Sequence, residues 1–431
     1  MNKLKLFIYG YLLVMLMILV ASCRKQEFAL PPEGEKVPYV DTVKLSLKEV
    51  LEKSPAKLFY QAWQRSSMES RLKTIGDAKS TFTILIPSDA AMESAGFTSQ
   101  KILDMQVKDL DSLMMFYTLK GRITAQDLES KADNYIGASL LTKPGIRVSL
   151  TQSTAVNLND VVPYYYQQRL QVKDGKTYVN GKLVGTGKFV AAKDGYVWLL
   201  DQMISRPDKT ILEVLKADGH FTLLLNILQY TDDQYAKILR AGMVFTGARV
   251  GFIKRYNWAI APPLYPGEKS LVNLIRTTAL LPNDEVFKNA GFNSLDDLNS
   301  FNLKRGLPRI TKDQFGRNIA VGNFATDSLL FYHLDFGAGV NFGFNSNEMT
   351  NAVMSNYLVS FKSPLAGEGY ISSYMPFDFS RDASGRVQLK VKEVPDGTAA
   401  TIVVADIPTL MGPIHVVDHF LTPKGFKLNQ K

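Results

Sequence analysis

Cysteine is nearly absent from this sequence, which contains a single one, Cys23, in 431 residues. One cysteine excludes a disulfide within the chain and a cysteine-based metal site. Histidine is scarce as well: there are four, and only His415 and His419 lie near each other. The alternating apolar pattern around these two predicts a strand, which would hold them about 13 Å apart. The sequence therefore predicts no metal site and no cofactor.

Catalytic motifs and basic stripes are also lacking. The formal net charge is +9, but no stripe of Lys and Arg is interleaved with aromatic residues, so nucleic acid is not an expected partner. The chain has no Gly-x-Ser-x-Gly sequence of the kind that presents a nucleophilic serine. The segment 185–188 (GTGK) lacks the Ser or Thr that follows the Lys of a phosphate-binding loop. These absences predict that the protein is not an enzyme.

The N-terminus has the pattern of a bacterial signal peptide. Residues 1–22 begin with Lys3 and Lys5, continue as an apolar run, and end in small residues. The sequence VASC that ends at Cys23 resembles the lipobox of bacterial lipoproteins, in which the signal is cut before the cysteine and the thiol is then diacylated. Two or three acyl chains give a stable membrane anchor. We therefore expect Cys23 to be lipidated and the membrane to be a partner through this N-terminal lipid.

A flexible tether is expected next, over residues 23–41. This segment is polar and rich in proline, which is typical of an extended linker. Position 24 is Arg rather than Asp, and in the lipoprotein sorting pattern this favours the outer membrane over retention in the inner membrane. The predicted location is the cell envelope, with the protein anchored in the outer membrane on its periplasmic or cell-surface face.

The rest of the chain contains an internal repeat, the strongest organising feature of the sequence. Counted from Pro87 and from Pro282, an Asp follows at +2, a Gly at +9 and a Phe at +10 in both halves. Four blocks recur in the same order. The paired segments are 47–51 with 211–215, 82–97 with 278–292, 113–119 with 328–334, and 195–201 with 412–418. The sequence thus predicts two copies of one domain, a first copy at 42–206 and a second copy at 207–424, followed by a tail at 425–431.

The local patterns within each copy predict an α+β order. The segments 47–63 and 211–228 have apolar residues at helical spacing. Short apolar strands precede Pro87 and Pro282, and the following Asp89 and Asp284 are predicted to cap the helices that come next. Further strands are expected at 147–150, 176–179, 196–200, 387–391, 400–404 and 414–417. Helices come first and strands last, which is the order of an α+β domain.

At the repeated blocks the chain resembles the fasciclin (FAS1) family. The strand-Pro-x-Asp block, the Phe-Tyr-His block at 331–333 and the closing Gly-x-Ile-His-Val-Val-Asp block at 412–418 carry the resemblance. It implies two tandem FAS1-like domains, each a β-sandwich or wedge with helices packed on one side. It also implies roles in adhesion or in matrix or carbohydrate contact, with binding residues near these motifs. Asp284, Tyr332 and His333 are the positions that match.

Two further features are candidate binding surfaces. In the run Tyr164-Tyr165-Tyr166, adjacent side chains alternate between the faces of a strand, so at least one should be exposed. Tyr164 and Tyr165 are therefore candidates for stacking on sugar rings or for a protein contact, or else they close their own domain. The second copy is longer, with a Pro-to-Tyr spacing of 50 residues against 30. Its additions at 302–323 and 337–347 are expected to be surface loops.

Together these observations predict an envelope-anchored, non-catalytic binding or adhesion lipoprotein that contacts an extracellular protein or polysaccharide. The alternative is an accessory subunit that captures ligand for an outer-membrane glycan uptake system. Nothing in the sequence indicates an oligomeric state.

Overall fold

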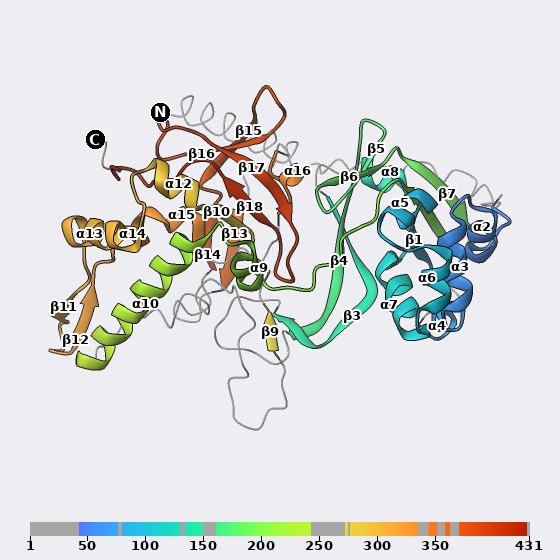
Figure 1. Cartoon of the computed structure of the whole chain (residues 1–431), viewed down its shortest axis with the longest axis horizontal. Coiled ribbons are helices and arrows are strands. Elements are labelled where there is room, and N and C mark those ends of the chain that lie inside the picture. Colours follow the sequence, from blue (N-terminus) through green and yellow to red (C-terminus); the bar gives the residue numbers. More distant parts are fainter. Residues whose placement is uncertain are drawn as a thin grey trace, which may run out of the picture. The chain divides into compact units, whose positions relative to one another are not determined.

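Figure 1 shows the computed structural model, which describes residues 43–75, 80–129, 134–149, 161–242, 272–274, 276–334, 344–350, 358–362 and 370–428. The elements below all belong to the compact unit Leu45–Lys431. The expected signal peptide, the lipidated Cys23 and the tether lie outside the described residues. No helix within the described ranges is both long enough and apolar enough to cross a bilayer.

The first copy begins with helices and continues into strands. Its helices are α2 (Leu47–Lys53), α3 (Lys57–Arg65), α4 (Met68–Ile75), α5 (Asp89–Ser94), α6 (Ser99–Asp104), α7 (Val107–Tyr117) and α8 (Ala125–Glu129). Its strands are β1 (Phe82–Pro87), β2 (Thr118–Lys120), β3 (Tyr135–Ser149), β4 (Val161–Lys173), β5 (Lys176–Val179), β6 (Lys182–Gly185), β7 (Lys188–Ala192) and β8 (Gly195–Leu200).

The strands of the first copy form one curled sheet in the order β6-β5-β4-β3-β2-β1-β8-β7. Its centre is the parallel pair of β1 and β8, in which Ile84 lies opposite Val197. All six residues of β1 are buried, as expected for a strand covered on both faces. The sheet bends back on itself, because the amide of Asp201, just after β8, donates to the carbonyl of Val184 on β6 at 2.6 Å. This closure gives the wedge that the fold class implies.

Each predicted opening helix is broken in two, which the sequence patterns did not indicate. In the first copy α2 ends at Ser54, which is extended because it precedes Pro55. In the second copy the break falls at Gly219, whose φ of 77° forms a left-handed C-cap. Both opening helices have a capping box, at Ser46 with Glu49 in α2 and at Thr210 in α9.

The second copy repeats this order and adds elements. Its helices are α9 (Ile211–Asp218), α10 (Thr222–Gly242), α12 (Asp284–Asn289), α13 (Leu295–Arg305), α14 (Ala325–Leu329), α15 (Phe331–Leu334) and α16 (Ser346–Met349). Its strands are β9 (Val272–Leu274), β10 (Ala279–Pro282), β11 (Arg309–Lys312), β12 (Asn318–Val321), β13 (Leu358–Lys362), β14 (Tyr370–Tyr374), β15 (Phe377–Arg381), β16 (Val387–Val391), β17 (Ala400–Ile407) and β18 (Ile414–Val417).

The same pair of strands lies at the heart of both copies. The main sheet of the second copy has the order β10-β18-β17-β16-β15. In it β10 pairs parallel with β18, as β1 does with β8 in the first copy. The two prolines match in register as well: Pro87 lies opposite Leu200, and Pro282 lies opposite Val417. In each copy the closing strand also pairs antiparallel with the strand before it. Two copies of one framework, predicted from the four blocks, are therefore confirmed.

Candidate functional site

The residue that caps the helix after each proline is not the predicted Asp. Ser88 Oγ accepts a hydrogen bond from the Ala91 amide at 3.2 Å, and Asn283 Oδ1 accepts one from the Val286 amide at the same distance. Both residues have the extended backbone of an N-cap. The prediction for Asp89 was wrong by one position, because the helix begins at the Asp itself and the residue before it also has a side-chain oxygen.

Asp89 and Asp284 instead link two helices. Asp89 Oδ1 accepts from the amide of Leu58 at 2.8 Å, in the first turn of α3. Asp284 Oδ1 accepts from the amide of Leu223 at 2.8 Å, and its Oδ2 accepts from the amide of Thr222 at 3.2 Å, in the first turn of α10. These amides have no acceptor within their own helices. The structure therefore gives Asp284, a predicted binding residue, a role in the framework, with both carboxylate oxygens occupied.

His333 is buried at the centre of the second copy and is fully hydrogen-bonded. Its Nδ1 lies 2.7 Å from the carbonyl of Leu280 on β10, and its Nε2 accepts from the amide of Leu421 at 2.8 Å. Nδ1 therefore carries the proton and the ring is neutral. Burial lowers the pKa of His333 to about 4. The side chain joins α15 to β10 and to the segment after β18.

The two copies satisfy the same backbone amide with different side chains. In the first copy, the amide of Ile204 donates to the hydroxyl of Tyr117 at 2.8 Å. Ile204 follows the closing Asp201 by three residues, just as Leu421 follows Asp418 in the second copy. His333 therefore occupies the role of Tyr117, although the sequence blocks align Tyr117 one residue earlier, with Tyr332.

Tyr332, the other predicted residue of this motif, is nearly buried in the core of the second copy. Its hydroxyl donates to Glu393 Oε1 at 2.5 Å, and only 9% of the residue is exposed. Burial first, and then the Glu393 carboxylate, raise the pKa of Tyr332. The hydrogen bond from Tyr332 lowers the pKa of Glu393. Tyr332 and His333 are thus adjacent in sequence but engage different partners.

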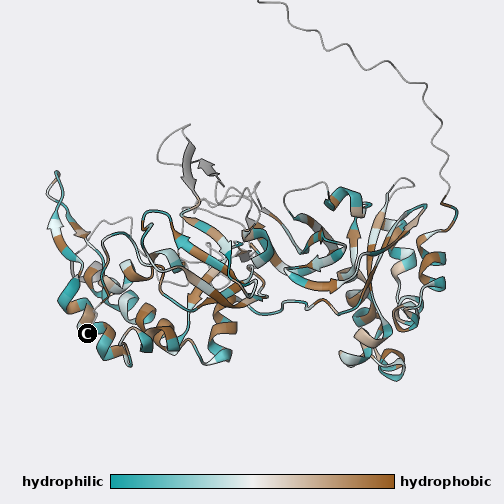
Figure 2. Ribbon diagram, turned by 90° about the horizontal axis from the view of Figure 1, so that it is seen from above, coloured by the Kyte–Doolittle hydropathy of each residue, from teal (hydrophilic) through white to brown (hydrophobic). Residues whose placement is uncertain are grey.

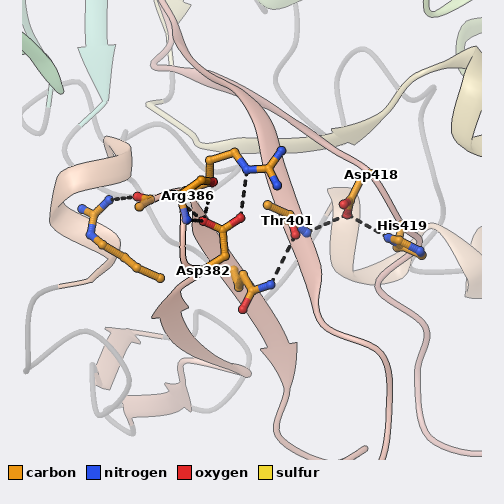
Figure 3. A network of polar contacts seen from close by, with 9 residues as sticks. Asp382, Arg386, Thr401, Asp418 and His419 are labelled. Carbon is orange, nitrogen blue, oxygen red and sulfur yellow. Dashed lines mark hydrogen bonds and ion pairs between the residues drawn. The ribbon is translucent and has the colours of Figure 1, made fainter.

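The closing Asp of the second copy belongs to a polar network at the end of β18 (Figure 3). Asp418 Oδ1 accepts from the amide of Thr401 at 2.6 Å and lies 2.8 Å from Nδ1 of His419. The amide of Asp418 in turn donates to the carbonyl of Thr401 at 3.1 Å. Asp418 thus fastens the end of β18 to the start of β17.

The tyrosine run alternates as predicted, but only one of its two candidates faces outward. Tyr164 is 2% exposed, and its hydroxyl donates to the carbonyl of Leu410 at 3.1 Å. Burial raises the pKa of Tyr164 to about 12. Tyr165 is 41% exposed, and its carbonyl accepts from Nη2 of Arg276 at 3.1 Å. Tyr165 is therefore available to a partner, whereas Tyr164 is part of the core.

A buried ion pair that the sequence did not reveal joins residues far apart in the chain. Arg169 on β4 and Glu348 on α16 are 8% and 6% exposed, and Arg169 Nη1 donates to Glu348 Oε1. The other carboxylate oxygen of Glu348 accepts from the amide of Asn345 at 2.7 Å. Burial raises the pKa of Glu348, against the effect of Arg169. The two residues are separated by 179 positions, so no local pattern could have paired them.

A second buried polar group lies on β17 and β18. His415 Nε2 lies 2.8 Å from the carbonyl of Phe344, and its Nδ1 accepts from the amide of Asp406 at 3.2 Å. Asp406 Oδ1 accepts from the amide of Ser346 at 2.8 Å. Because Nδ1 accepts from an amide, the ring of His415 is neutral like that of His333. Burial lowers the pKa of His415. Across the residues that the structure describes, no three His, Cys, Asp or Glu side chains come together as a metal-binding group.

The fold and these contacts define a duplicated α+β module whose polar motif residues hold its backbone together. Residues 54–206 match the family model described as the fasciclin domain. The first copy is therefore a fasciclin domain, and the same strand framework is repeated in the second copy. Fasciclin domains are adhesion and binding modules.

One solved structure among those that match is a FAS1 domain pair from the insect cell adhesion molecule fasciclin I. It is 15% identical to this chain, covers 86% of this chain and 98% of its own, and has a TM-score of 0.30. The assignment therefore rests on the family match and the internal repeat. Among curated proteins none matches the chain.

Proposed function

We propose that this protein is a lipid-anchored, non-catalytic binding or adhesion protein of the bacterial envelope, acting on an extracellular protein or polysaccharide. The observation that carries the proposal is the fasciclin domain at residues 54–206. The hydrogen bonds of Asp284 and His333 support it, because they tie up the motif residues in the framework. We therefore assign ligand binding to exposed side chains on the strands and loops.

The anchor is proposed at Cys23. The support is the signal-like segment before it and its position as the only cysteine of the chain. Cells that express the full chain and are fed labelled palmitate should incorporate the label into the wild-type protein and not into Cys23→Ser. After cell fractionation, the wild-type protein should be found in the outer-membrane fraction and the Cys23→Ser protein should not. Equal labelling of both proteins would refute the anchor without touching the proposed binding role.

The proposed ligand contact is the outer face of β4 around Tyr165. An exposed tyrosine offers a rigid apolar ring with a polar edge, which suits sugar rings and protein partners. Binding to a glycan array and to whole cells should fall for Tyr165→Ala and persist for Tyr165→Phe, since Phe keeps the ring. Tyr196→Ala, on β8, serves as the matched control. If Tyr165→Ala binds every glycan and cell as the wild type does, this face is not the contact.

A further inference from the structure

The insertion at 302–323 forms a hairpin with an unusual surface. The strands β11 and β12 pair antiparallel, with Ile310 opposite Ala320. All four residues of β11 are exposed and all four of β12 are half-buried, so β11 is the open side of the hairpin among the residues that the structure describes. Figures 1 and 2 show the hairpin projecting beyond α13, and β12 lies against α10. The insertion was predicted to be a surface loop, and it is instead an exposed hairpin.

Large apolar side chains gather on this hairpin and on the end of α13. Phe315 at the turn is 70% exposed and Leu303 is 64% exposed, the two highest values for large apolar side chains among the described residues. Leu307 and Ile310 are each 45% exposed. Single exposed apolar residues are normal, but a group within thirteen positions marks an interaction surface.

Positive charge accompanies the apolar side chains. Between residues 302 and 323 the chain has five basic side chains and one acidic one. The basic residues are Lys304, Arg305, Arg309, Lys312 and Arg317. The acidic residue is Asp313, and it forms an ion pair with Arg317 at 2.6 Å. Arg305 also has a polar or ionic interaction within the protein. Lys304, Arg309 and Lys312 therefore leave the surface complementary to a negatively charged partner.

The turn of the hairpin does not require its phenylalanine. The amides of Phe315 and Arg317 both donate to Asp313 Oδ1 at 2.9 Å, and Arg317 Nε donates to Asp313 Oδ2 at 2.7 Å. Gly316 supplies the positive φ, 75°. The Phe315 ring itself contacts only the Arg317 guanidinium among the ring contacts described, at 5.0 Å. The backbone and Asp313 hold the turn, and the ring points outward.

A similar turn occurs a second time in this chain, with Asp382 and Arg386 in the places of Asp313 and Arg317 (Figure 3). Between β15 and β16, the amides of Ser384 and Arg386 donate to Asp382 Oδ1, each at 2.9 Å. Arg386 Nε donates to Asp382 Oδ2 at 2.9 Å. Ser384 thus stands where the other turn has Phe315. The Ser384 hydroxyl also donates to Asp382 Oδ1 at 2.7 Å, a bond that Phe315 cannot make. Because the same amide and arginine contacts form with either residue, the exposed ring of Phe315 is a feature of the surface and not of the fold.

We propose that this surface, defined as Leu303, Leu307, Ile310 and Phe315 with the surrounding basic side chains, binds an anionic lipid bilayer at its headgroup layer. Such an interface accepts apolar side chains about 5–10 Å deep and attracts cations to its lipid phosphates. A polyanionic polysaccharide would pair with the charges but offers no apolar layer to Leu303 or Ile310. The inference does not depend on the anchor at Cys23, and the two would act together, since a tethered contact gains from a high effective concentration.

The test uses the chain from residue 24 onward, which contains the whole compact unit from Leu45 but cannot be lipidated. Flotation with vesicles of phosphatidylglycerol and phosphatidylcholine in equal parts should carry the protein upward. Vesicles of phosphatidylcholine alone should not, and high salt should weaken the binding. Phe315→Ser should reduce the partition coefficient about tenfold. The double variant Lys304→Gln with Arg309→Gln should reduce it about thirtyfold.

The matched controls come from the first copy. Leu103→Ser removes an apolar side chain that is 49% exposed, and Lys101→Gln with Lys108→Gln removes two surface cations; both should bind as the wild type does. Circular dichroism should show that Phe315→Ser keeps its fold. The proposal is overturned if the wild type fails to float with anionic vesicles, or if Phe315→Ser floats equally well. Charge-dependent binding that ignores Phe315 would mean a polyanion partner instead.

Discussion

Lowering the pH should destabilise the second copy through a single buried ring, that of His333. An exposed histidine has a pKa near 6.5, whereas burial lowers that of His333 to about 4. Between about pH 6.5 and pH 4 the unfolded chain therefore binds a proton that the folded chain rejects. Stability is full above this window and is lost as the pH falls through it.

The size of the effect follows from the two pKa values. A fall from 6.5 to about 4 corresponds to about 3 kcal/mol of unfolding free energy, with a slope that approaches about 1.4 kcal/mol per pH unit inside the window. His415 acts in the same direction, because burial lowers its pKa too. Glu348 acts in the opposite direction, because its pKa is raised. The contribution of His333 must therefore be isolated by substitution.

The assay compares the wild type with His333→Gln in urea titrations across this window. The variant should be less stable at neutral pH, because it loses two well-placed hydrogen bonds. Between about pH 4 and pH 6.5 its unfolding free energy should change with pH by about 1.4 kcal/mol per pH unit less than that of the wild type, which corresponds to one proton. Proton NMR gives a direct check, since the chain has four histidines and the variant identifies the missing resonance. Parallel pH profiles, or a His333 resonance that titrates near neutral pH, would refute the reasoning.

Three further predictions concern the framework. Asp89→Ala and Asp284→Ala should each lower the unfolding free energy by about 1–2 kcal/mol in urea titrations, because helix amides lose their acceptors; unchanged midpoints would contradict this. Glu348→Gln should cost about 3 kcal/mol or more, since Arg169 keeps a buried charge without its partner; a thermal melt like that of the wild type would show that the pair is solvated. Gly291→Ala should cost about 1 kcal/mol purely through its φ of 92°, as nothing lies within 4 Å of the added carbon; Gly291→Asn should cost less in the same melt.

The parts of the fold that the sequence predicted are those set by local chemistry. The strands before Pro87 and Pro282 are bounded by a residue that cannot continue a ladder, and the structure ends β1 and β10 there. The turn at Asn180-Gly181 between β5 and β6 has both residues at positive φ, 52° and 82°, the conformation that an Asn-Gly pair favours. Alternation in the tyrosine run correctly predicted that at least one ring is exposed, and the exposed ring is that of Tyr165.

The errors arose where the decisive partner is distant in sequence. The contact between Asp89 and the amide of Leu58 spans 31 residues, so the spacing of the Pro-x-Asp motif could not distinguish a cap from a link between helices. The exposure of Tyr164 could not be judged either, because its hydroxyl partner, Leu410, is 246 residues away. Which face of β4 is covered depends on the packing of the assembled sheet, so the sequence of the strand alone could not predict it.

The division between framework and surface also follows from the duplication itself. Where the two copies share a residue type, as at Asp89 and Asp284, the side chain satisfies backbone amides that every copy must satisfy. Where they differ at one role, as Tyr117 and His333 do, either side chain can accept from the same amide. The motifs that both copies share therefore consist of residues that hydrogen-bond to backbone groups of the fold. A binding function specific to this protein is better sought in what the copies do not share. The hairpin at 302–323, whose turn has the exposed Phe315 where the similar turn at 382–386 has Ser384, is the clearest such place.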